Sequence, residues 1–199
     1  MNIIRFHIGI FAALVAMVLA GSLRAQGEDV FAFIPPGGKT LLAEVARGAP
    51  ANEIQAILTG KRTRAEWEAY LKQRTADLPA LRDLDEFGLA TLADYLAFNM
   101  PLPEGSVPAD PGKADWSAVL PPDGRDLALE NCQFCHIITV VVTQDKTQDA
   151  WLGTMNKPSH IEIKITPEQR QALASYLVLN AAIPVDLVPE ELRAGGASY

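Results

Sequence analysis

The chain has few of the residues that build several kinds of site. Two of its 199 residues are cysteines and three are histidines. Basic residues are in the minority: 17 lysines and arginines stand against 24 aspartates and glutamates, and the formal net charge is −7. This balance argues against nucleic acid as a partner, because phosphate binding needs clustered positive charge. The acidic excess fits either solubility or a basic docking partner.

Long apolar runs are also scarce, and the one near the start is short for a membrane span. Residues 8–20 are apolar, follow Arg5 and precede small residues, whereas a spanning helix needs roughly 20 residues. This layout is typical of a secretory signal peptide. Leu23 and Ala25 fit its cleavage pattern, so we predict a signal peptide over residues 1–25 and a mature chain from Gln26, with a cut after Ala20 as the alternative. We expect a periplasmic or otherwise exported protein with no membrane span after signal removal.

The two cysteines lie three positions apart and are followed at once by a histidine, in the order Cys132-Gln-Phe-Cys135-His136. Cys-x-x-Cys-His is the attachment signature of c-type haem. Two thiols at this spacing can form thioether bonds to the two vinyl groups of one haem, and the histidine can reach the iron as its proximal ligand. We expect a helix capped by Asp123 or Asp126 to lead into the motif, with both cysteines on one face.

Other uses of two close cysteines fit this chain less well. A thiol redox site would follow a strand in a βαβ unit, but no β-rich run precedes Cys132. A structural zinc needs four ligands, and His160 is the one further cysteine or histidine that the mature chain supplies. A plain short disulfide in an interaction module without haem is the remaining alternative.

Around this motif the sequence resembles the class I c-type cytochromes, over roughly residues 121–184. The second element of the resemblance is a helix expected from Ile165 to Leu177. Thr166, Pro167 and Gln169 form the start of such a helix, as cap, first helical residue and capping-box partner. The resemblance implies that its apolar stripe packs on the attachment helix and the haem face. The stripe and its expected partners are Leu173, Tyr176 and Leu177 against Leu127 and Ala128.

The chain departs from the family in one respect. Family members often carry a proline soon after the motif, and its carbonyl orients the proximal imidazole. Residues 137–156 contain no proline, so the hydrogen bond to His136 must come from another carbonyl.

The sixth iron ligand has three candidates: Met100, Met155 and His160. Met155 precedes the cap at Thr166, close to where the family places its axial methionine, and we predict it as the ligand. His160 is the alternative and would give a bis-histidine haem. A methionine ligand raises the reduction potential relative to a second histidine.

The first half of the chain repeats the residue pattern of the second half. Matches in one order across three segments predict an internal duplication. The matched residues are Pro35, Pro36, Gly38, Leu41 and Glu44 with Pro121, Pro122, Gly124, Leu127 and Glu130; Thr63 and Trp67 with Thr147 and Trp151; and Leu92, Ala93, Tyr95, Leu96 and Asn99 with Leu173, Ala174, Tyr176, Leu177 and Asn180.

In this register the first half has lost its ligands. Ala46, Ala49 and Pro50 stand where the second half has Cys132, Cys135 and His136, and Leu71 stands at Met155. We therefore expect a haemless cytochrome c-like domain that fills the vacancy with side chains. The expected fillers are Leu71, Leu81, Leu84, Phe87 and Phe98.

These observations predict an all-α protein with two cytochrome c-like helical domains in tandem, joined by a Pro/Gly-rich linker. The boundaries are 26–103 for the haemless domain, 104–120 for the linker, 121–184 for the haem domain and 185–199 for a C-terminal tail, which we expect to fray. Trp116 should pack onto one domain. The β-branched run 137–143 is expected to be an extended loop near the haem edge.

The predicted function is transfer of single electrons by one covalent haem c, without enzymatic activity of its own. The expected redox partner is a periplasmic dehydrogenase, of which the chain would be the cytochrome subunit, or a terminal electron acceptor. The alternative is a haem enzyme or gas sensor with an open sixth coordination site.

Overall fold

The computed structural model of the chain describes residues 29–133, 135–160 and 163–193. The predicted signal peptide lies outside these residues. The chain divides into two compact units, Met1–Ala32 and Phe33–Tyr199. The described end of the first unit is a turn in which Asp29 accepts hydrogen bonds from Phe31 and Ala32. All that follows concerns the second unit.

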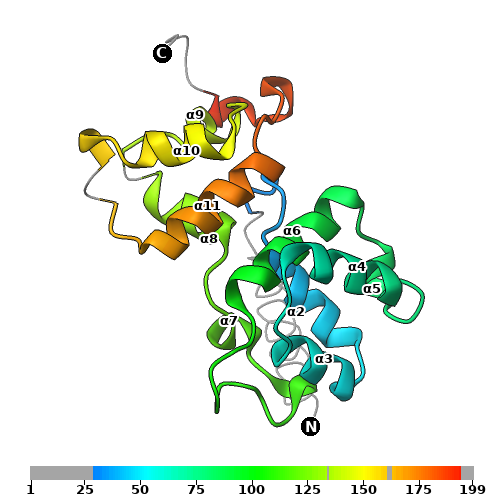
Figure 1. Cartoon of the computed structure of the whole chain (residues 1–199). Helices are drawn as coiled ribbons and strands as arrows, with labels where there is room; N and C mark the ends of the chain where they lie inside the picture. The colour runs from blue at the N-terminus through cyan, green and yellow to red at the C-terminus, as the bar shows by residue number, and fades with distance from the viewer. Residues whose placement is uncertain (1–28, 134, 161–162, 194–199) are drawn as a thin grey trace, which may run out of the picture. The chain divides into compact units, whose positions relative to one another are not determined.

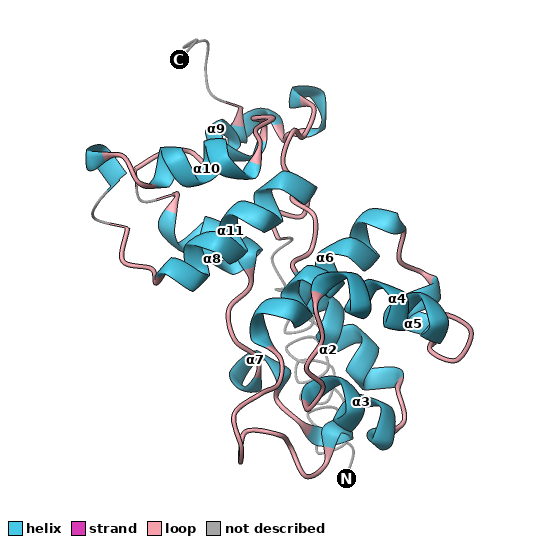
Figure 2. Cartoon of the chain, in the orientation of Figure 1, coloured by secondary structure: helices cyan, strands magenta, loops and turns pink. Residues whose placement is uncertain are grey.

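The described part of the chain is helical and contains no strand (Figure 2), which confirms the predicted all-α class. Within it, no helix is long and apolar enough to cross a bilayer. The helices, labelled in Figure 1, are α2 (Gly38–Gly48), α3 (Ala51–Leu58), α4 (Arg64–Arg74), α5 (Pro79–Arg82), α6 (Glu86–Asn99), α7 (Trp116–Val119), α8 (Gly124–Asn131), α9 (Thr139–Val142), α10 (Gln148–Met155) and α11 (Pro167–Asn180). Short 3-10 turns are η1 (Pro111–Lys113), η2 (Pro158–His160), η3 (Val185–Leu187) and η4 (Glu190–Leu192).

The two halves use matching helices in matching ways. In the first, α2 packs on α6 and α6 on α4; in the second, α8 packs on α11 and α11 on α10. A threonine caps the N-terminus of both α4 and α10, at Thr63 and Thr147. Four residues later each helix buries a tryptophan, Trp67 or Trp151.

The helix pairs cross at glycine. A Cβ added at Gly38 would come within 2.1 Å of the Tyr95 Cβ, and one added at Gly124 would come equally close to the Tyr176 Cβ. Real Cβ atoms do not approach other carbons so closely, so the backbones of α2 and α8 reach their partner helices only because these positions lack a side chain.

The two halves meet where α6 packs on α11. Hydrogen bonds run across this junction in both directions. The Tyr95 hydroxyl donates to the Pro121 carbonyl at 2.9 Å, and the Tyr176 hydroxyl donates to the Pro35 carbonyl at 2.6 Å. Between them, Thr91 and Asn180 form a buried hydrogen bond of 3.0 Å. Burial raises the pKa of both tyrosine hydroxyls above the ordinary value, so they remain protonated donors.

The largest apolar cluster belongs to the first half and the segment after it. Trp116 and Leu120 are buried in this cluster, which confirms that Trp116 packs onto the helices. The segment predicted as a linker therefore lies against the core, with η1 and α7 folded within it. The domain boundaries themselves stay a prediction.

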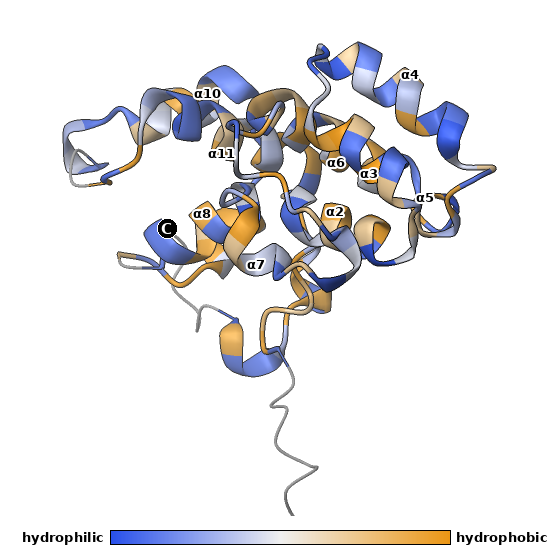
Figure 3. Ribbon diagram, turned by 90° about the horizontal axis from the view of Figure 1, so that it is seen from below, coloured by the Kyte–Doolittle hydropathy of each residue, from blue (hydrophilic) through white to orange (hydrophobic). Residues whose placement is uncertain are grey.

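The core of the first half differs in part from the predicted set of side chains. Leu71 and Leu81 are completely buried, as expected, and Leu84 packs against the core. The prediction is wrong for Phe87 and Phe98, which are 62% and 42% exposed. Helix α3, which begins directly after Pro50, instead buries Ile54, Ile57 and Leu58. Helix α4 is hydrophilic over most of its length (Figure 3), but it buries Trp67 and Leu71 completely.

Two expectations about irregular segments are also wrong. Residues 139–142 form α9 rather than an extended loop, because Ile138, Val141 and Val142 are buried at a helical spacing. The C-terminal segment does not fray as far as Arg193. Val188 is 1% exposed, and the Leu192 carbonyl accepts a 2.6 Å hydrogen bond from the Thr139 hydroxyl.

Candidate functional site

Helix α8 leads into the cysteine motif as expected. Asp123 caps its N-terminus, and its carboxylate accepts a 2.9 Å hydrogen bond from the Asp126 amide, which completes a capping box. The helix ends earlier than predicted, at Asn131, with Cys132 as its C-cap. One further turn is held by the His136 amide, which donates to the Cys132 carbonyl at 3.2 Å. The motif thus lies at the end of α8 and not within it.

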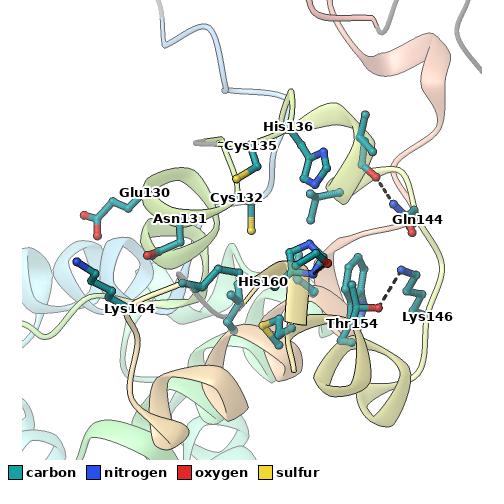
Figure 4. Close-up of a pocket in the computed structure, with 18 residues that line it drawn as sticks. Glu130, Asn131, Cys132, Cys135, His136, Gln144, Lys146, Thr154, His160 and Lys164 are labelled. Atoms are coloured by element: carbon teal, nitrogen blue, oxygen red, sulfur yellow. Dashed lines mark hydrogen bonds between the residues drawn. The ribbon is translucent and has the colours of Figure 1, made fainter. Parts of the chain in front are cut away.

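The three motif residues open onto one cavity of about 730 Å³, within the range of roughly 300–1,000 Å³ typical of cofactor pockets. Cys132 is half-buried, whereas Cys135 and His136 are exposed at the rim. Figure 4 shows both cysteines and His136 along one side of the opening, with His160 below His136. The residues that line the cavity all belong to the second half.

The walls of the cavity combine an apolar face with a few charges. Its apolar side includes Leu173 and Leu177 of α11, which confirms that this stripe of α11 faces the motif; α11 also begins as predicted, at Thr166 with Gln169 in a capping box. The charged groups on the wall are the ammonium groups of Lys146 and Lys164 and the carboxylate of Glu130, so cations outnumber the anion. Such a cavity suits a large planar ligand that is apolar over most of its area and carries acidic groups at an edge.

The polar groups present fit a haem. Two thiols and an imidazole stand in the attachment order around the cavity. The Lys146 ammonium, which also lines the cavity and lies 4.6 Å from the Trp151 ring centre, could pair with an acidic group of the haem. The indole nitrogen of Trp151 is buried with no hydrogen-bond partner among the described residues, but so is that of Trp67 in the first half, so this feature does not distinguish the two halves.

The three candidate sixth ligands are separated by the fold. Met155, the last residue of α10, and His160, in η2, both line the cavity. The His160 ring centre lies 6.1 Å from that of His136, with 44° between the ring planes. Met100 is 7% exposed within the apolar cluster of the first half and does not line the cavity. Met155 stays the prediction from sequence and His160 its alternative.

The electrostatics of the thiols bear on the thiol redox alternative. The pKa of the Cys132 thiol is raised to about 11, mainly by burial and to a smaller extent by electrostatic repulsion from the neighbouring Cys135. Thiol redox enzymes instead lower the pKa of their nucleophile, since the thiolate is the reactive form. Both cysteines are free thiols in this structure.

The corresponding place in the first half carries a cation in contact with aromatic rings. The Arg62 guanidinium lies 4.5 Å from the Trp67 ring centre and 4.3 Å from that of Tyr70. Lys146 and Trp151 form the same kind of pair beside the cavity. Sequence reasoning matched the two tryptophans and gave them no role; the signal was their common spacing from a threonine cap.

Among the described residues, no group of three or more His, Cys, Asp or Glu side chains could hold a metal ion. No model of a known family matches the chain, and no curated protein or solved structure shows significant similarity to it.

Proposed function

We propose that this chain is an exported cytochrome that carries one covalent haem c and transfers single electrons. The observation that carries the proposal is the convergence of Cys132, Cys135 and His136 on one cavity whose opposite wall offers a second axial ligand. Covalent haem attachment needs this set of groups in this order.

Each residue then has a defined task. The thiols of Cys132 and Cys135 hold the haem edge, and the His136 imidazole binds the iron from one side. Leu173 and Leu177 cover an apolar face and keep water away. A haem supplies a reversible one-electron couple, whose potential the protein sets through the axial ligands and the polarity of the pocket.

The partner is a redox protein in the exported compartment. We propose that the chain serves a periplasmic dehydrogenase as its cytochrome subunit or passes electrons to a terminal acceptor. Support comes from the predicted signal peptide and from the net charge of −7, which favours a partner with a basic docking face.

The first half is proposed to be a duplicated, haemless cytochrome c-like domain. Support comes from the repeated contacts: a glycine against a tyrosine at each helix crossing, a tyrosine hydroxyl donated to the other half, and a tryptophan four residues after each threonine cap. Its task is to brace the haem-binding half, because the reciprocal hydrogen bonds tie the helices of that half to a second core.

The test is a redox titration of the purified periplasmic protein, followed in its visible spectrum, with carbon monoxide added to the reduced form. We expect a single reversible one-electron couple and no reaction with carbon monoxide at neutral pH. Carbon monoxide binding would favour the alternative, a haem enzyme or gas sensor with an open sixth site. Absence of any haem spectrum would favour the disulfide-stapled interaction module.

A further inference from the structure

Met155 and His160 both reach the cavity, but the fold uses them differently. Met155 lies one helical turn after Trp151 on the same face of α10, and the two side chains are 5% and 3% exposed. In the first half, Trp67 and Leu71 have the same spacing on α4 and are completely buried. A hydrocarbon at Leu71 therefore fills the place that Met155 fills, so packing alone accounts for the burial of Met155.

His160 has no such packing role. It lies in the short turn η2, is half-buried, and faces the cavity together with His136. The ring centres are 6.1 Å apart. Two imidazoles that bind one iron from opposite sides place their centres roughly 6 Å apart, because each metal–nitrogen bond is about 2.0 Å and each ring centre lies about 1.1 Å beyond its nitrogen. The spacing of His136 and His160 matches this requirement (Figure 4).

The hydrogen bonding of His160 leaves the correct nitrogen available. The Ser159 hydroxyl lies 3.3 Å from Nδ1 of His160. It can accept the Nδ1 proton in the tautomer whose Nε2 is free to bind a metal. Histidine ligands almost always engage their second nitrogen in a hydrogen bond, which fixes the tautomer and the ring orientation.

The backbone around His160 is also held in place. The guanidinium of Arg170, on α11, donates to the Met155 carbonyl before the turn and to the Ile163 carbonyl after it, both at 2.9 Å. Within the turn, the His160 amide donates to the Lys157 carbonyl at 2.8 Å. These bonds tie Met155 and Ile163 to α11, which forms part of the cavity wall, and limit the cost of ordering a ligand at His160.

We infer that His160, and not Met155, is the iron ligand opposite His136. This inference rests on the proposed function, since it presupposes the haem. It makes the site a bis-imidazole haem, with a lower reduction potential than a His–Met haem and no open position for a diatomic gas. The chain is then suited to acceptors that take electrons at low potential.

The experiment compares the haem-loaded wild type with His160→Ala and Met155→Leu, the second of which places at 155 the residue found at 71. Wild type and Met155→Leu are expected to lack the far-red sulfur-to-iron band, to give the electron paramagnetic resonance of a low-spin bis-imidazole haem and to share one potential. His160→Ala should become high-spin, bind carbon monoxide when reduced, and return to low spin when imidazole is added.

A far-red band in the wild type that disappears in Met155→Leu would overturn the inference, as would a His160→Ala protein that stays low-spin without added imidazole. Should His160→Ala fail to accumulate, the wild-type and Met155→Leu spectra decide the question by themselves. Failure of the proposed function is distinguishable from failure of this inference. It would appear as protein without covalent haem, which intact mass detects before any spectrum is interpreted.

Discussion

Gly124 of α8 lies against Tyr176 of α11 so closely that an added Cβ would come within 2.1 Å of the tyrosine Cβ and 3.2 Å of the Ala172 carbonyl oxygen. The same contact recurs between Gly38 and Tyr95. Because Tyr176 also donates its hydroxyl to the other half, this crossing fixes both the cavity wall on α11 and the junction between the halves.

We therefore expect Gly124→Ala to destabilise the haem-loaded protein by about 1–3 kcal/mol, the usual cost of overpacking. Urea unfolding followed by circular dichroism measures the change. The matched control is Gly153→Ala on α10, where a Cβ meets nothing within 4 Å. This control should be stabilising by up to about 1 kcal/mol, because alanine is the better helix former. Equal effects at the two positions would contradict the close crossing.

Asp123 serves two helices. Its carboxylate accepts from the Asp126 amide in α8 and, at 2.9 Å, from the Lys39 amide in the first turn of α2. The N-cap of α2 is Gly37, whose side chain cannot cap, and a Cβ there would lie 2.0 Å from the Asp123 carboxylate. Asp123 thus replaces the missing cap of α2.

Asp123→Ala should consequently cost more than the loss of an ordinary cap, which is about 0.5–2 kcal/mol. Asp123→Asn should recover only part of the stability, because it keeps one acceptor oxygen for one of the two helices and turns an NH2 group toward the amide of the other. Asp85→Ala is the control, because Asp85 caps only α6, through Gly88. Denaturant unfolding of the three variants tests the order, and an Asp123→Ala cost no larger than that of Asp85→Ala would refute the double cap.

Asp94 gives a pH-dependent prediction. Burial raises the pKa of this carboxyl above its ordinary value of 3.8, and hydrogen bonding to Ser175 and the charge of Arg64, 3.7 Å away, only partly oppose the effect. The folded state therefore holds the proton more tightly than the unfolded state. The contribution of Asp94 to stability is fully present below pH 3.8 and is lost as pH rises through the folded pKa.

Asp94→Asn removes this dependence. Its stability relative to wild type should increase as pH rises from about 3.5 to 7, as measured by thermal unfolding across that range. If the stability of the variant relative to wild type decreased as pH rises, the ion pair with Arg64 would outweigh the cost of burial.

Much of the helical frame follows from local sequence signals. The caps at Thr166 and Asp123 are short-range hydrogen bonds, so the sequence predicts where α11 and α8 begin. Thr63 and Thr147 cap α4 and α10 in the same way, but from the sequence they were matched only as repeat positions. The motif Cys132 to His136 is likewise local.

The errors came where tertiary contacts override propensity. The β-branched residues of α9 favour strands in isolation, but Ile138, Val141 and Val142 satisfy a buried helical face. In the register of the predicted repeat, the run 137–143 corresponds to residues 51–57, which are in α3, so the match between the halves favours a helix at both places. Phe87 and Phe98 were misplaced because they lie near the two ends of α6, whose buried residues are all between them, and an apolar residue need not face the core.

The arrangement of side chains on the cavity wall opposite the cysteine motif could not be predicted from the sequence. The distance between His136 and His160, the unpaired indole nitrogen of Trp151, and the bonds from Arg170 to Met155 and Ile163 depend on how α10 and α11 pack. Sequence spacing favoured Met155 over His160; their different surroundings appear only in the folded chain.

The most direct test of the account is the intact mass of protein purified from cells that also express a cytochrome c maturation system, under denaturing conditions that remove any loosely bound haem. The wild type should carry the mass of one haem, and a Cys132→Ala/Cys135→Ala variant should carry none. A wild-type mass equal to that of the polypeptide alone would show that the chain is not a c-type cytochrome.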